Sequence, residues 1–93
     1  MNNYELLYII DNSIEEEARE AVIEKLNNVV TGLNGTIENV EKWGTRKLAY
    51  PINYKNEGYY VLVNFQAEAT VPAELERIMR ITDAVVRYMV IVK

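Results

Sequence analysis

Gly44-Thr45-Arg46-Lys47-Leu48-Ala49-Tyr50-Pro51-Ile52-Asn53 is the stretch of sequence that decides the fold. Its apolar residues alternate at Leu48, Tyr50 and Ile52, which is typical of a β-strand. Pro51 has no N–H to donate to a neighbouring strand, so we expect this strand at the edge of its sheet. A polar turn is expected to follow over residues 53–58, and it would join this strand to the next one as a hairpin.

Strand and helix patterns alternate on both sides of this hairpin. A helix is expected after Ser13, which forms a capping-box pattern with Glu16, and Gly32 and Gly35 offer left-handed positions to end it. The spacing of apolar residues predicts that its buried stripe consists of Ala18, Val22, Leu26, Val29 and Leu33. Aromatic and β-branched residues predict the remaining strands over 4–10, 36–43, 59–67 and 84–92, with a bulge near Gly44.

A second helix is expected to begin at Thr70, with Pro72 in its first turn, and to bury Leu75, Ile78 and Met79. The resulting order is strand, helix, strand, strand, helix, strand. This order predicts an α+β, ferredoxin-like split β-α-β fold, with a four-stranded antiparallel sheet and two helices on one face. The 93 residues are expected to form one such domain over 1–93.

Both faces of the predicted sheet are apolar. The face under the helices is expected to hold Tyr4, Leu6, Tyr8, Ile10, Val61, Val63, Phe65, Val86, Tyr88 and Val90. The opposite, uncovered face would then carry Glu5, Leu7, Ile9, Tyr60, Leu62, Asn64, Arg87, Met89 and Ile91. A contiguous apolar surface of this kind indicates an interaction site for a protein or a nucleic acid, unless a dimer or a loop covers it.

The same arrangement of elements occurs in the RNA recognition motif, where aromatic residues on the central strands stack on bases. Only Gly58 and Tyr59 match the third-strand pattern of that motif, because it requires Gly or Ala where Tyr60 stands. Of the aromatic contacts typical of that motif, only stacking of a base on Tyr60 therefore stays an expectation here.

The charges are divided between the two parts of the chain. Residues 1–41 hold nine acidic and two basic residues, a net charge of −7, whereas residues 42–93 hold five acidic and eight basic residues, a net charge of +3. The segment from Lys42 to Lys55 contains no acidic residue. A random distribution of charged residues along a surface loop can produce such a segment. The alternative is a molecule with one basic and one acidic side, whose basic side contacts phosphate.

The composition argues against an enzyme. The chain has no histidine and no cysteine, which excludes Ser/His and Cys/His nucleophilic pairs, disulfides and thiolate metal sites, and Ser13 is its single serine. No cofactor, metal or small-molecule substrate is therefore expected. A run of about 18 apolar residues and a secretory signal are both absent, so we expect a cytoplasmic protein with no membrane association.

The pattern Gly44-x-Arg46-x-Leu48-Ala49-Tyr50-x-Ile52-Asn53 resembles the signature of the family of bacterial ribosomal protein six of the small subunit. The resemblance extends to Tyr4-Glu5, to Gly58-Tyr59-Tyr60 and to the segment 82–90. It implies a structural protein of the ribosome that takes part in translation and has no catalytic site. It also implies binding to the central domain of the small-subunit ribosomal RNA, as a heterodimer with the basic ribosomal protein eighteen, in support of platform assembly.

Two sets of residues are expected to carry these contacts. The RNA-binding residues would be Lys42, Arg46, Lys47, Asn53, Tyr54, Lys55 and Arg87, with Lys42 peripheral. The partner-binding residues would be Leu7, Ile9, Tyr60, Leu62, Met89 and Ile91 on the uncovered face. The alternative is a ferredoxin-like interaction module that associates with itself through this face or through its edge strands.

Overall fold

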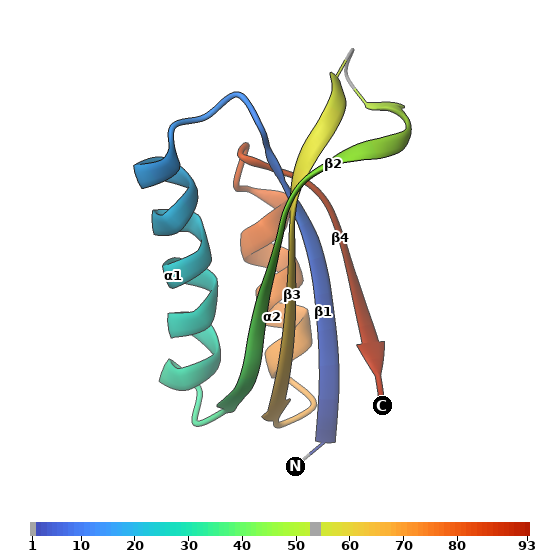
Figure 1. Ribbon diagram of the computed structural model, residues 1–93. Coiled ribbons are helices and arrows are strands. Elements are labelled where there is room, and N and C mark those ends of the chain that lie inside the picture. The colour runs from blue at the N-terminus through green and yellow to red at the C-terminus, as the bar shows by residue number, and fades with distance from the viewer. Residues whose placement is uncertain (1, 53–54) are drawn as a thin grey trace.

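The structure, a computed structural model, describes residues 2–52 and 55–93, and only the backbone at 48–52, 55 and 56 (Figure 1). Its elements follow the predicted order: β1 (Asn2–Asp11), α1 (Glu16–Gly32), β2 (Thr36–Ile52), β3 (Lys55–Ala67), α2 (Val71–Arg80) and β4 (Val85–Val92). The strands form one antiparallel sheet in the order β2-β3-β1-β4. Both helices lie on the same side of this sheet, so the predicted fold class is confirmed (Figure 1).

The strand that contains Pro51 is β2, and it lies at the edge of the sheet as predicted. The expected turn over 53–58 is too long, because β3 already begins at Lys55 and pairs with Ile52. The β2–β3 hairpin extends beyond the ends of the helices as an arm (Figure 1). The described backbone of this arm therefore lies beyond both helices (Figure 1).

The helix-facing side of the sheet forms the core. Tyr4, Leu6, Tyr8, Ile10, Val61, Val63 and Phe65 are all buried there, as predicted, together with Leu75, Ile78 and Met79 of α2. The prediction for Val86 is wrong. The register between β1 and β4 shifts between Ile9 and Ile10, so that Val85 rather than Val86 packs against the core.

Helix α1 begins and ends differently from the prediction. The Ser13 hydroxyl donates to Asp11 Oδ1 at 2.7 Å, and the helix begins beyond it without a side-chain cap, so the capping box is wrong. At the other end Asn34 adopts the left-handed conformation (φ 66°) that was expected of a glycine. The Gly35 N–H then donates to the Val30 carbonyl at 2.8 Å, which completes a Schellman motif.

The buried stripe of α1 consists of Ile23, Leu26 and Val30, with Val22 and Val29 at its sides. The predicted stripe is thus rotated about the helix axis. Ala18 is exposed, and Leu33 lies beyond the last helical residue with 43% of its surface exposed. The helical period could not extend to Leu33 because the Schellman motif had already ended the helix.

Candidate nucleic-acid and partner interface

The uncovered side of the sheet is the candidate interface, and its strand pairing brings the predicted residues together. Leu7 lies between Leu62 on β3 and Met89 on β4, and Ile9 lies between Tyr60 and Arg87 in the same way. Because side chains alternate along a strand, these residues share the face that no helix covers. We call this surface the open face.

Two of the predicted partner-binding residues are less accessible than the sequence suggests. Ile9 and Leu62 are 7% and 8% exposed, although neither helix lies over them. The exposed apolar surface of the open face is therefore displaced toward β4. There Met89 and Ile91 are 48% and 45% exposed, while Leu7 and Tyr60 are half-buried.

The opposite edge of the open face carries a residue that was not predicted there. Trp43 lies between Lys42 and Gly44, where the register of β2 shifts and Gly44 has a φ of 83°. The Trp43 ring stacks on Tyr60, with the ring centroids 6.3 Å apart and the planes at 10°. Since Tyr60 belongs to the open face, the Trp43 ring lies there too, and 41% of the residue is exposed.

One signal in the sequence could have placed Trp43. The prediction allowed one bulge in this strand, whereas β2 shifts register between Ile37 and Asn39 and again between Lys42 and Gly44. Ile37 and Val40 both pack against the core because of the first shift. Three positions after Val40, strict alternation already turns Trp43 to the opposite face.

The predicted cations do not form one cluster. Arg46 pairs in register with Gly58, on the open face, and its guanidinium carbon lies 5.5 Å from the centre of the Trp43 ring. Arg87 is exposed on the same face. Lys47 pairs with Glu57 and faces the other side of the arm. Lys42 is also on the helix side, where its Nζ lies 2.9 Å from both carboxylate oxygens of Glu20 in α1.

The remaining predicted RNA-binding residues are Asn53, Tyr54 and Lys55. Asn53 and Tyr54 are outside the described residues, and Lys55 is described by its backbone alone. At the other end of the open face, Lys93 Nζ lies 3.6 Å from Glu5 Oε2. The open face thus carries the cations Arg46 and Arg87 together with the acidic residues Glu41 and Asp11, and Lys93 lies near Glu5 at the end of β4.

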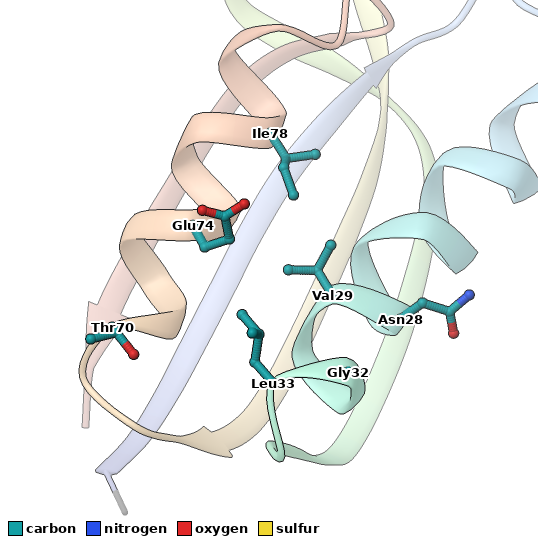
Figure 2. A pocket seen from close by; sticks show the side chains of 7 residues that line it. All are labelled: Asn28, Val29, Gly32, Leu33, Thr70, Glu74 and Ile78. Atoms are coloured by element: carbon teal, nitrogen blue, oxygen red, sulfur yellow. The ribbon is translucent and has the colours of Figure 1, made fainter.

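A hollow of about 480 Å³ lies on the opposite side of the molecule, between α1 and α2 (Figure 2). Val29 from α1, Leu33 just beyond the end of α1 and Ile78 from α2 point into it, while Asn28 points away (Figure 2). Glu74 on its rim is hydrogen-bonded to Arg77, which lowers the pKa of that carboxyl below its ordinary value. This lining offers apolar contact and no pair of groups for acid–base chemistry.

Within residues 2–52 and 55–93 no group of three or more metal-ligating side chains is placed to hold a metal ion. In the same residues, no helix is both long enough and apolar enough to cross a membrane.

The chain is similar to ribosomal proteins over nearly all of its length. The sequence model of the family described as Ribosomal protein S6 matches residues 3–92. The small ribosomal subunit protein bS6 of Clostridium novyi is 56% identical over 98% of this chain and 96% of its own length. The protein of the same name from Alkaliphilus oremlandii is 53% identical over the same shares.

A solved structure agrees with this assignment. The crystal structure of 30S ribosomal protein S6 from Thermotoga maritima superimposes with a TM-score of 0.94 at 32% identity, covering 99% of this chain and 87% of that one. The protein is accordingly a structural, non-enzymatic component of the small ribosomal subunit, located on the cytoplasmic ribosome of bacteria. The chain belongs to the ribosomal protein S6 family.

Proposed function

We propose that the chain binds the central domain of the small-subunit ribosomal RNA as a heterodimer with the basic ribosomal protein eighteen, and that it supports platform assembly. One observation carries this proposal: the open face combines exposed apolar residues along β4 with exposed cations at Arg46 and Arg87. A single face therefore offers both kinds of surface that an RNA–protein complex requires.

The RNA side of the proposal is supported by the arm. Arg46 and Lys47 are exposed on its two sides, and Lys55 lies across from Ile52 near its tip. Cations on a hairpin that extends past the helices can reach phosphates without a clash between the helices and the RNA. Lys42 stays peripheral, because its ammonium group already has a carboxylate partner in Glu20.

The partner side is supported by Met89 and Ile91. Large apolar side chains that are nearly half exposed side by side on one strand favour burial against another protein. The net charge of −4 also suits a basic partner, which would supply much of the positive charge that the RNA requires.

The test is a titration of the central-domain RNA fragment with this protein, alone and with protein eighteen, at two salt concentrations. Tight binding that weakens with salt and needs both proteins would support the proposal. A folded protein that binds under neither condition would contradict it. A concentration-dependent homodimer without RNA affinity would instead support the self-associating module.

A further inference from the structure

We propose that Trp43 stacks on an unpaired base of the bound RNA, with Tyr60 and Arg46 holding the base and its phosphate in place. This inference rests on the proposed RNA-binding function and adds a contact to a base where that function assigns only contacts to phosphate. The observation behind it is the group of three side chains, Arg46, Trp43 and Tyr60, at the β2 edge of the open face.

Trp43 and Tyr60 form an offset-stacked pair. Such pairs have ring centroids about 4.5 to 7 Å apart, and those of Trp43 and Tyr60 are 6.3 Å apart with planes at 10°. The rings are therefore offset, so that neither covers the whole of the other. The exposed 41% of Trp43 is consistent with an aromatic surface that is open to the solvent.

The Trp43 side chain is held in place from below and from the side. Tyr60 is half-buried in the central strand β3, directly beside Ile9 of β1, so its ring is a firm support. Gly44, with a φ of 83°, follows Trp43 directly in the bulge where the register with β3 shifts. Such a fixed aromatic surface loses little conformational freedom when a planar ligand stacks on it.

The position of Arg46 favours a nucleotide over an apolar side chain as the occupant. Its guanidinium is 5.5 Å from the Trp43 ring centre and is exposed, so it can contact the phosphate of a base that stacks on the ring. Aromatic surfaces next to arginine are a common means of binding single-stranded nucleic acid. Met89, which we assign to the protein partner, lies at the opposite edge strand of the sheet.

The test compares two oligonucleotides that carry equal charge. One is a short single-stranded uridine RNA, and the other is an abasic strand of the same length. Because the chain has a single tryptophan, its fluorescence reports directly on Trp43. We expect the uridine strand to quench this fluorescence and to bind at least about tenfold more tightly than the abasic strand.

The substitution Trp43→Leu should reduce that ratio to about one while leaving the salt dependence unchanged, as measured by anisotropy of labelled strands. Tyr59→Leu is the matched control, because Tyr59 lies on the helix side, where Arg19 covers its ring at 3.9 Å. The control should keep the preference for bases. Circular dichroism should show that both variants are folded.

Three results would overturn this inference. They are equal affinity of the parent for both strands, no detectable binding of the uridine strand at millimolar concentration, and a Trp43→Leu variant that loses protein eighteen but keeps its preference for bases. The third result would assign Trp43 to the protein interface. In each case, salt-sensitive binding of the central-domain RNA by the parent protein with protein eighteen would still support the proposed function. Failure of the base-stacking inference is therefore distinguishable from failure of the proposed function.

Discussion

Lys42 Nζ lies 2.9 Å from both carboxylate oxygens of Glu20, and this ion pair ties the edge strand β2 to helix α1. Both side chains are more than 40% exposed, so the pair contributes at most about 1 kcal/mol to the free energy of unfolding. The pair also holds one of the predicted RNA-binding cations on the side of the molecule that faces away from the open face.

We therefore predict that Lys42→Ala and Arg46→Ala have different effects on RNA binding. Arg46→Ala should lower the affinity of the heterodimer for the central-domain fragment and reduce the slope of log K against log salt by about 0.7 to 0.9. Lys42→Ala should change affinity by about twofold or less and leave the slope intact. Affinities measured at four salt concentrations check this, and an equal loss in both variants would contradict the assignment.

A second prediction concerns the exposed apolar residues of β4. Met89→Asp should abolish heterodimer formation, because it places a charge where the partner is expected to bury apolar surface. The protein should remain folded, since Met89 is 48% exposed. Leu62→Asp cannot make this test, because at 8% exposure Leu62 also stabilises the fold.

Ile81→Asp is the matched control for this measurement. Ile81 is an equally large apolar residue, is 66% exposed, and lies just after α2 rather than on the open face. Size-exclusion chromatography with protein eighteen should show a complex for Ile81→Asp and none for Met89→Asp. A complex with both variants would refute the placement of the partner on β4.

The sequence was sufficient to predict the order of the elements, the edge position of β2 and most of the core. These features depend on long apolar patterns, and β1 pairs with β3 without a register shift, from Tyr4 with Phe65 to Ile10 with Tyr59. The pairing of Ile9 with Tyr60 and Arg87 then follows from the fold, so the sequence also predicted the centre of the open face.

The positions of Trp43 and Val86 depend on register shifts, because one extra residue moves every later side chain to the other face of the sheet. Val86 lies beside the shift between β1 and β4, and Trp43 follows from alternation once the shift between Ile37 and Asn39 is known. The ion pair of Lys42 with Glu20 joins residues that are far apart in the sequence, so only the packing of α1 against β2 reveals it. For that reason, counting charges along the sequence does not distinguish Lys42, which has an acidic partner, from Arg46.

A third prediction uses two glycines at the end of α1. A Cβ atom at Gly35 would lie 2.7 Å from Val30 Cγ1, 2.8 Å from the Val30 oxygen and 3.0 Å from the Gln66 oxygen. Gly35→Ala should therefore lower the free energy of unfolding by about 1 to 3 kcal/mol. A Cβ at Gly32, within the helix, would meet nothing within 4 Å, so Gly32→Ala should raise it by up to about 1 kcal/mol.

Urea denaturation of the two glycine variants, followed by circular dichroism, checks both signs. Gly32→Ala serves as the control for Gly35→Ala, because the two changes add the same methyl group three residues apart. A stabilised Gly35→Ala variant would mean that the Val30 side chain and the β3 backbone give way without cost.

A fourth prediction concerns Tyr8, whose side chain is fully buried under the helices. Its hydroxyl has no hydrogen-bond partner among the described residues. Burial raises the pKa of this phenol above its ordinary value, and the nearby Glu20 and Tyr59 raise it further. The folded protein therefore keeps Tyr8 protonated at a pH at which the unfolded chain releases that proton.

The sign of the pH effect follows from this difference. Below pH 10 Tyr8 is neutral in both states, whereas above it only the unfolded chain ionises, so the free energy of unfolding falls by about 1.4 kcal/mol per pH unit. Tyr8→Phe should remove that loss, amounting to about 1.4 kcal/mol at pH 11, and should be neutral or slightly stabilising at pH 8. Urea denaturation at both pH values checks it, with Tyr60→Phe, at a half-buried ring on the open face, as the control. If Tyr8→Phe loses as much stability between pH 8 and pH 11 as the parent and the control do, then the Tyr8 phenol is not protected from ionisation in the folded protein.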